Sequence, residues 1–473
     1  MRAKSRIRPY ACGTCQPDAG PSVCIAHPEV VANIRKLVRS AGVLSTADAR
    51  LAQSMGLLDI PSIGRRGWND GVIYPLDDQP VLSAARGHAA RPEQRLSLAS
   101  ASGSLNCLVL LVDFSDNPGT TVASHYQTLL FDKSNPDSMA SFYRDMSYGK
   151  LDVTGTVVGW LRAPQPYAFY VDGQSGTGNN FPHNTPGLLR DVLTAYCRTD
   201  SLAPFDRNGD GFIDGLFLVH AGPGAETQAT PAKRKTMIWS HKWTLPMPFV
   251  NNGIKAFAYF TAPENGRLGV FSHEFGHFLG LPDLYDTSYR SRGAGDWCLM
   301  AGGSWNGNGD VPARLSAWCL ATLGWIKPRN VKTARTHDLA PLEIDRKDCL
   351  RVWTGGKPSP EYFLLENRQQ AGRDAQLPGS GLAVWHIDER QSDNTNPITY
   401  RVGLVQADGK RELELNRNDG DAADLFPGAL GVNKVNDTTG IAPTTRANDG
   451  SATGVALSGI KEMNGLVRVR VKV

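Results

Sequence analysis

The stretch SHEFGHFLGLPDLYD, residues 272–286, places two histidines four residues apart, with a glutamate directly after the first. Positions i and i+4 lie on one face of an α-helix, so His273 and His277 point the same way if residues 271–279 are helical. Two imidazoles at this spacing can bind one zinc ion at about 2.0–2.1 Å each. Glu274 stands beside the first ligand, where it can act as general base towards a metal-activated water. The stretch predicts a catalytic zinc site.

The residues after the helix supply a third ligand. Gly280 can end the helix, because glycine readily adopts the positive φ that such a turn requires. Asp283 follows His277 by six residues, which is the position of the third ligand in the pattern H-E-x-x-H-x-x-G-x-x-H. A carboxylate oxygen binds zinc at a distance comparable to that of imidazole. Asp286 is the competing third ligand, and a buried amphipathic helix with packed histidines is the alternative for the motif as a whole.

A methionine follows within a glycine-flanked turn. Residues 295–305 read GDWCLMAGGSW and place Met300 directly before Ala-Gly-Gly. Enzymes of the extended zinc pattern carry a methionine turn downstream of the ligands. Met300 is therefore predicted to be the turn methionine, with ordinary core packing as the alternative.

A second loop, residues 206–215 (DRNGDGFIDG), has the alternating oxygen ligands of a calcium loop, with Gly211 at the sixth position for the sharp turn. The predicted calcium ligands are Asp206, Asn208, Asp210, the backbone carbonyl of Phe212, and Asp214. An EF-hand would end in a glutamate at position twelve, where this chain has Phe217, so a distant residue would complete the site. The alternative is a turn in which the Asp and Asn side chains bind their own backbone. Residues 416–424, NRNDGDAAD, form a weaker candidate of the same kind.

The composition is that of a globular protein and excludes several classes. The chain has 473 residues, of which 41% are hydrophobic, and a net charge of +4. This balance argues against nucleic acid or an anionic membrane as partner. No apolar run reaches the roughly 18 residues of a membrane span. The first 20 residues open with basic side chains but have no apolar run behind them, so no signal peptide is recognisable.

The eight cysteines permit several arrangements. Cys12, Cys15 and Cys24 cluster near His27, where disulfides, free thiols or a small zinc site of irregular spacing are all open. Cys298 and Cys319 could bridge the methionine turn to the helix that follows. Four further side chains near the motifs are expected to pack within the fold: His241, His386, Tyr285 and Tyr289. The alternatives are that His241 assists the transition state, and that Tyr285 or Tyr289 donates a hydrogen bond to the developing oxyanion.

The order of predicted elements gives an α+β fold. Residues 1–104 form an N-terminal segment that ends in a polar linker at 87–104. An apolar run at 105–116 predicts a buried central strand, and residues 255–264 alternate like an exposed edge strand. After Trp325 short strand candidates separated by turns predict a β-rich C-terminal region.

Several separated blocks resemble the immune inhibitor A family of secreted bacterial metallopeptidases, which belong with the metzincins. The blocks are LLVDFSD (110–116), FYRDMSYGKLDVTGTVVGW (142–160), FDRNGDGFIDGLFLVHAGPGAE (205–226), IWSHKW (238–243), HEFGHFLGLPDLYD (273–286), GDWCLMAGGSW (295–305), LSAWCLATLGWI (315–326), FLLENRQQ (363–370), LPGSGLAVWHIDE (377–389) and GDAADLFPG (420–428).

The resemblance implies a metzincin-like catalytic domain over 105–328, with a mixed twisted sheet and a zinc helix, followed by a β-rich domain over 329–473. It implies His273, His277 and Asp283 as zinc ligands, Glu274 as base and Met300 as turn methionine. It also implies secretion, although the leader typical of the family is not visible here.

The expected function is therefore that of a zinc-dependent endopeptidase acting on protein or peptide substrates, with calcium as a second expected metal. Two alternatives remain at this stage. One is a latent zymogen held inactive by residues 1–104. The other is a calcium-stabilised, non-catalytic binding protein, against which the intact Glu274 argues, because a structural zinc site has no need of a base.

Overall fold

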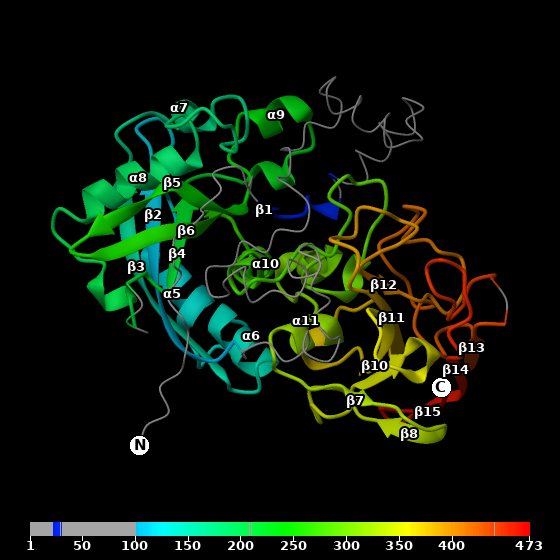
Figure 1. The fold of residues 1–473 in the computed structure, drawn as a ribbon. Helices are drawn as coiled ribbons and strands as arrows, with labels where there is room; N and C mark the ends of the chain where they lie inside the picture. Colours follow the sequence, from blue (N-terminus) through cyan, green and yellow to red (C-terminus); the bar gives the residue numbers. More distant parts are fainter. Residues whose placement is uncertain (1–21, 29, 31–100, 208, 210, 439) are drawn as a thin grey trace, which may run out of the picture. The chain divides into compact units, whose positions relative to one another are not determined.

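The computed structural model describes residues 22–28, 30, 101–207, 209, 211–438 and 440–473 (Figure 1). The chain divides into two compact units, and the boundary falls between Gly280 and Leu281. Of the described residues, unit 1 comprises those from 22 to 30 and Ser102–Gly280, and unit 2 comprises Ala101 and Leu281–Val473. Most of the predicted N-terminal segment, including nearly all of the linker at 87–104, lies outside the described residues. Within the described part of the chain, no helix has the length and apolar character needed to cross a membrane.

Unit 1 is built on a mixed six-stranded sheet. Its strands, in spatial order, are β1 (Ser22–Val23), β5 (His241–Asn251), β6 (Ile254–Pro263), β4 (Gly215–His220), β2 (Gly103–Asp113) and β3 (Leu151–Arg162). The four strands from β6 to β3 run parallel to one another. β5 is antiparallel to β6, and β1 is antiparallel to β5. The apolar run predicted as a central strand is β2, which lies between β4 and β3.

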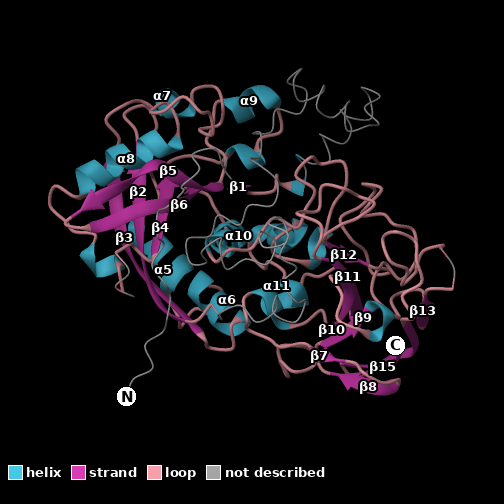
Figure 2. Ribbon diagram, viewed as in Figure 1, coloured by secondary structure: helices cyan, strands magenta, loops and turns pink. Residues whose placement is uncertain are grey.

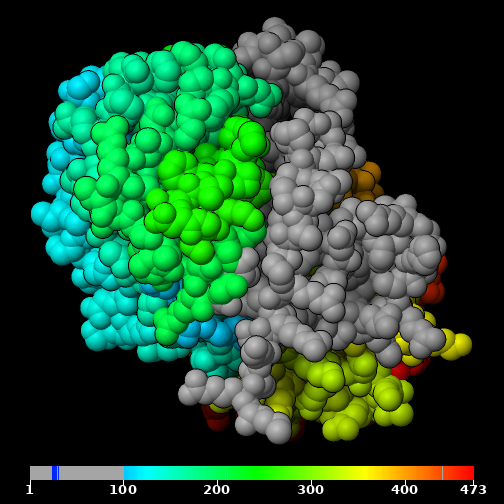
Figure 3. All heavy atoms as spheres, turned by 60° about the vertical axis from the view of Figure 1, so that its left-hand side comes forward, coloured from blue at the N-terminus to red at the C-terminus, as the bar shows by residue number. Residues whose placement is uncertain are grey.

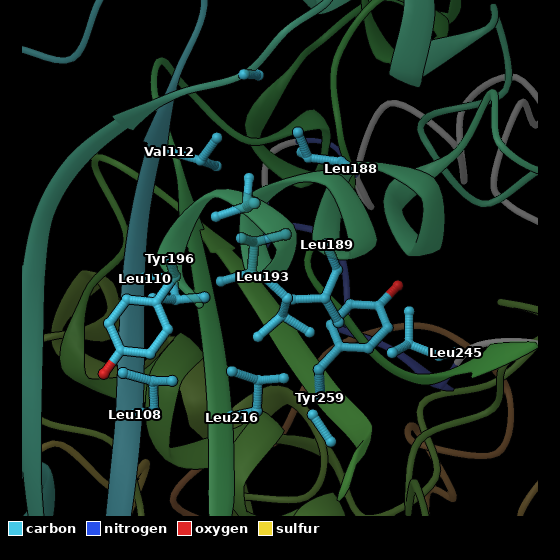
Figure 4. Packing of buried hydrophobic residues seen from close by; sticks show 14 of the residues in the cluster. Leu108, Leu110, Val112, Leu188, Leu189, Leu193, Tyr196, Leu216, Leu245 and Tyr259 are labelled. Atoms are coloured by element: carbon cyan, nitrogen blue, oxygen red, sulfur yellow. The ribbon is translucent and has the colours of Figure 1, made fainter. Parts of the chain in front are cut away.

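One face of this sheet is covered by α8 (Thr185–Tyr196). Side chains of a strand alternate between the two faces, so Leu108, Leu110 and Val112 of β2 share one side. They belong to the same buried cluster as Leu193 of α8, together with residues of β4 and β6 (Figure 4). Asn184 caps α8 by accepting a hydrogen bond from the backbone N–H of Gly187 at 3.0 Å.

The other face carries a second group of helices, as Figure 2 shows for the two sides of the sheet. They are α5 (Ala123–Phe131), α6 (Met139–Met146) and α10 (Leu268–Phe278). Phe217 of β4 points to this side, where its ring centroid lies 5.9 Å from that of Phe275 on α10. Two further short helices of unit 1 are α7 (Tyr167–Val171) and α9 (Pro231–Lys235). The motif helix α10 is thus held on the sheet by aromatic packing.

The prediction of an edge strand at 255–264 was wrong. These residues form β6, which is an inner strand paired with β5 on one side and β4 on the other. Outside β6 lies β5, and among the described strands only the two-residue β1 lies beyond it. The register between β5 and β6 shifts between Thr244 and Phe249. Pro246 and Pro248 in this strand lack the N–H donors of an inner ladder, and proline is tolerated at sheet edges. Exposed side chains such as Met247 and Val250 mark β5 as a surface strand, within the green region of Figure 3.

Unit 2 contains two sheets. The five-stranded sheet is mostly antiparallel, and the four-stranded sheet is antiparallel. The five-stranded sheet is ordered β12 (Val402–Leu404), β11 (Gly381–Asp388), β10 (Glu361–Arg368), β9 (Leu350–Trp353), β7 (Arg329–Asn330). The four-stranded sheet is ordered β13 (Lys434–Asn436), β14 (Ala456–Met463), β15 (Leu466–Lys472), β8 (Arg335–Leu339). Side chains from both sheets share one apolar core, which includes Phe363, Val384, Leu457 and Val469. Residues 281–328 precede these sheets and include α11 (Ala317–Thr322).

The mixed sheet with helices on both faces fits the predicted α+β peptidase domain. The residue boundaries predicted for the domains, at 104/105 and 328/329, stay predictions.

Candidate metal centre

The motif residues lie on a fully buried helix. Every side chain of α10 is buried, and His273 and Glu274 have no exposed surface. The Tyr143 hydroxyl on α6 donates a 2.5 Å hydrogen bond to the carbonyl of Ser272, next to the first histidine. The helix ends as predicted: Gly280 has φ +97°, a conformation that favours glycine.

The two imidazoles converge on one point. The Nε2 atoms of His273 and His277 lie 3.1 Å apart, and the ring planes are inclined by 89°. One carboxylate oxygen of Asp283 joins them, so that one ligand atom from each of the three residues lies within 4.8 Å of the others. Two ligand atoms at about 2.1 Å from one ion, with a tetrahedral angle between them, are about 3.4 Å apart. The donor set therefore fits a zinc ion.

Asp286, the alternative third ligand, accepts hydrogen bonds from other residues through both of its carboxylate oxygens. Its carboxylate accepts hydrogen bonds from the backbone N–H of Ser288 at 2.8 Å and of Ser291 at 3.0 Å. The hydroxyls of the same two serines donate to it as well. Burial raises the pKa of Asp286, and these hydrogen bonds oppose the rise. Asp286 thus organises the turn after the motif, and the geometry favours Asp283 as the ligand.

Met300 is fully buried and lies in a turn of unit 2. Its carbonyl accepts a 2.7 Å hydrogen bond from the backbone N–H of Leu284, the residue after Asp283. The turn is therefore tied directly to the segment that supplies the third ligand. Its predicted role as turn methionine stays a prediction.

The predicted calcium loop is only partly described, because Asn208 and Asp210 lie outside the described residues. Asp206 accepts a 3.0 Å hydrogen bond from the backbone N–H of Gly211. Asp214 accepts one from Asn106 at 2.8 Å. Phe212 forms an isolated bridge with Lys255. The contacts of Asp206 are those of the turn alternative, and calcium at this loop stays a prediction.

Two further histidines form contacts of the kind expected for packed residues. His241 is fully buried and lies with Nε2 3.0 Å from the Tyr259 hydroxyl and Nδ1 2.6 Å from the Trp239 carbonyl. Burial lowers the pKa of His241 to about 4, so the ring is neutral at physiological pH. His386 stacks on Phe363 and contacts Glu361 at 2.9 Å.

Tyr285 and Tyr289, the two tyrosines considered near the motif, are both buried. Their ring centroids lie 5.9 Å apart. This contact agrees with packing as the expected role of both side chains.

Five of the cysteines are free thiols, namely Cys107, Cys197, Cys298, Cys319 and Cys349. Cys298 and Cys319 are buried with their sulfurs 3.9 Å apart, so they are neighbours but not bonded. Cys12 and Cys15 lie outside the described residues. Cys24 is buried, and its carbonyl accepts a 2.8 Å hydrogen bond from the Trp239 indole.

Sequence reasoning missed the backbone pairing around this cysteine. Ser22 and Val23 pair with Lys242 and His241 of β5, and the Cys24 N–H donates to the Ser240 carbonyl at 2.9 Å. A two-residue strand has no periodicity, so the sequence carries no pattern that could have revealed it.

An H-E-x-x-H helix on a mixed sheet, with an aspartate beside both imidazoles, places this domain among the metallopeptidases. Residues 102–325 match the sequence model described as the immune inhibitor A peptidase M6 catalytic domain. This match identifies residues 102–325 as a metallopeptidase domain similar to that family.

Two relatives illustrate the match. Over 261 residues the chain is 34% identical to immune inhibitor A of Bacillus thuringiensis subsp. alesti, an alignment that covers 44% of this chain and 38% of that protein. Over 399 residues it is 33% identical to the pre-pro-metalloprotease PrtV of Vibrio cholerae serotype O1 (strain M66-2), covering 63% of this chain and 43% of that protein. The chain spans less than half the length of these relatives.

Proposed function

We propose that the chain is a zinc-dependent endopeptidase of metzincin-like architecture, in which Glu274 is the general base. The observation that carries the proposal is the convergence of His273, His277 and Asp283 within 4.8 Å of one another. Three protein ligands leave a fourth position open, which is the arrangement of catalytic rather than structural zinc sites. Bound there, zinc would act as a Lewis acid and lower the pKa of a coordinated water towards about 7.

In the proposed reaction the protein itself transfers the proton, through a side chain of the buried helix α10. Glu274 has no exposed surface and follows the first ligand directly in α10. We assign it the proton of the attacking water, which it then delivers to the leaving amine. A carboxylate directly after the first ligand of this motif is the group that serves as general base in zinc metallopeptidases.

The substrate is assigned to the outer edge of the sheet. β5 is the antiparallel outer strand next to the four parallel strands, and among the described residues only β1 pairs with its outer side, at His241 and Lys242. An extended peptide can add to such an edge through main-chain hydrogen bonds. This assignment replaces the one that the sequence suggested for residues 255–264.

A second candidate state, a latent zymogen, is favoured by β1. Residues 22–24 occupy part of the edge that the substrate would use, with backbone pairing to β5 and a hydrogen bond from Cys24 to Ser240. Ile25 and Val30 are buried as well. In this state the N-terminal segment would compete with substrate until it is removed.

An extracellular location, expected from the resemblance to secreted peptidases, belongs to the same proposal.

The test is digestion of casein by the full chain, before and after limited proteolysis, with metal content measured in parallel. The proposal expects cleavage that a chelator abolishes and that added zinc restores. The zymogen state expects the rate to rise when residues 1–30 are removed. Zinc bound with no cleavage of casein or of an unfolded protein, before or after removal of that segment, would instead favour a non-catalytic binding protein.

A further inference from the structure

Two buried thiols face each other beside the turn at Met300. The sulfurs of Cys298 and Cys319 lie 3.9 Å apart, and neither side chain has any exposed surface. The two residues are 21 positions apart in the chain, with Cys298 before the turn and Cys319 in α11. Both belong to unit 2. The proposed peptidase chemistry makes no use of this pair.

The distance between the two sulfurs is within reach of a covalent bond. The sulfurs of a disulfide are about 2.05 Å apart, so the two atoms must approach by about 1.9 Å in total. Rotation of a cysteine side chain about its Cα–Cβ bond by a few tens of degrees moves the sulfur by about half of this distance. The approach therefore lies within the range of side-chain rotation on the backbone as it stands.

Hydrogen bonds of the surrounding backbone hold the two cysteines in place. Leu299, the residue after Cys298, donates its N–H to the carbonyl of Arg314 at 3.2 Å, which ties the turn to the chain before α11. The Ser316 hydroxyl caps α11 by accepting from the N–H of Cys319 at 3.4 Å. The same hydroxyl donates to the Cys319 sulfur, also at 3.4 Å. Both sulfurs are thus positioned by the fold.

The surroundings favour a thiolate at Cys298 and a thiol at Cys319. Burial raises the pKa of Cys298, but hydrogen bonds from the Cys319 side chain and from the backbone of Ser316 and Met300 outweigh it and lower the pKa to about 7. Burial and the neighbouring Cys298 raise the pKa of Cys319. The nucleophile of thiol–disulfide exchange is the thiolate, so Cys298 is the sulfur that attacks first.

We propose that Cys298 and Cys319 form a disulfide bond during oxidative folding, which fastens the turn at Met300 to α11. The electron acceptor is a low-molecular-weight disulfide such as oxidised glutathione. The Cys298 thiolate attacks one of its sulfurs, breaks its S–S bond and releases one small thiolate. The Cys319 thiolate then attacks the Cys298 sulfur of the mixed disulfide and releases the second. The protein loses two electrons and two protons, and the small disulfide gains them to become two thiols.

Burial decides when the bond forms. Neither sulfur is accessible in the folded chain, so a small disulfide reaches the pair before the fold closes around it. The finished bond would be shielded from reductants in the same way. It would close a loop around Met300, whose carbonyl accepts from the N–H of Leu284 at 2.7 Å. Since Leu284 follows Asp283, the bond would limit the movement of the segment that carries the proposed third ligand.

Peptide mapping without reduction tests the bond directly. The full chain carrying Glu274→Ala, which prevents self-digestion, is folded from the reduced, unfolded state in a mixture of reduced and oxidised glutathione. Chain secreted into an oxidising compartment, and never unfolded, is mapped in parallel. Remaining thiols are alkylated in denaturant before digestion with trypsin.

The cleavage sites of trypsin make the result unambiguous. Cleavage after Arg292 and Arg314 places the two cysteines on separate peptides, 293–314 and 315–329, and neither peptide has a second cysteine. Mass spectrometry should find these two peptides joined, and reduction should separate them.

Melting temperatures test what the bond does. The form folded with oxidised glutathione should melt several degrees above the form folded in excess reductant, because a cross-link around a loop of about 20 residues restricts the unfolded chain. Cys298→Ala and Cys319→Ala should each diminish this difference. Cys197→Ala, at the half-buried cysteine that follows α8, should keep it. Each variant is compared with its own reduced form, so the cost of the substitution itself cancels.

The joined peptides, together with a redox-dependent melting temperature that both alanine variants diminish, support the proposal. Alkyl groups on both Cys298 and Cys319 in the oxidatively folded chain, or a bond from either of them to another cysteine, overturn it. An equal redox difference in the parent and in Cys298→Ala overturns the bracing of the turn. None of these readouts depends on peptide cleavage, so the result stands apart from the proposed peptidase activity.

Discussion

The Nε2 atoms of His273 and His277 lie 3.1 Å apart on a helix that has no exposed side chain. Two rings one helical turn apart can meet in this way only when both occupy rotamers that point to the same side. The packing of α10 against Tyr143 and Phe217 fixes the helix, and with it the direction of both rings. The donor pair is thus arranged by the packing of the protein core.

Glu274→Ala should abolish peptide cleavage while zinc remains bound. The substitution removes the proposed base but leaves the three ligand side chains unchanged. General base catalysis contributes about 10²- to 10⁴-fold, so kcat should fall by at least about a hundredfold. The measurement is casein digestion together with the zinc content of the purified variant. Cleavage retained at the original rate would exclude Glu274 as the base.

Asp283→Ala should weaken zinc binding, and Asp283→His should largely preserve it. Alanine removes the third donor, whereas histidine restores the nitrogen ligand found at this position in the extended motif. The matched control is Asp286→Asn, which disturbs the turn through Ser288 and Ser291 but removes no donor. Competition with a chromogenic chelator measures the affinity. Equal losses in the alanine variant and the control would show that the segment only supports the fold.

The zinc helix and its final glycine could be predicted because each depends on local spacing. The four-residue spacing places both histidines on one face of the helix, and Gly280 ends the helix through its own backbone conformation. The inner position of β6 could not be predicted, because alternation along a strand does not show which neighbours the strand will pair with. The grouping of Asp408, Glu412 and Asp421 in unit 2 was equally hard to find, since Asp408 lies thirteen residues before Asp421 and ordinary surface turns use the same residue types.

Cys24→Pro should raise peptidase activity if the N-terminal segment competes with substrate. Proline removes the N–H that Cys24 donates to Ser240, and so weakens the docking of β1 on β5. We expect a higher initial rate of casein cleavage and a lower KM, with zinc content unchanged. Cys24→Ser is the control, because it alters the side chain and keeps the donor. A rate unaffected both by the proline variant and by removal of residues 1–30 would argue that β1 has no inhibitory role.

Glu264→Gln should destabilise the chain at neutral pH and remove part of its acid sensitivity. Burial alone would raise the pKa of Glu264, but hydrogen bonds from Gly222, Thr120 and Thr121 outweigh it and lower the pKa to about 2. A carboxylate whose pKa is lower in the folded state stabilises the fold above its unfolded value, near 4.5. That contribution is lost as the pH falls from about 4.5 towards 2.

The variant should therefore melt several degrees below the parent at pH 7, since the difference in pKa corresponds to a stabilisation on the order of 3 kcal/mol. The two proteins should converge as the pH approaches 2. Asp137→Asn, at an exposed position of the same unit, should follow the parent throughout. Melting temperatures of all three, recorded from pH 2 to 7 in a Glu274→Ala background, provide the comparison. A constant gap between variant and parent over this range would mean that Glu264 contributes through packing or neutral hydrogen bonds, and not through its charge.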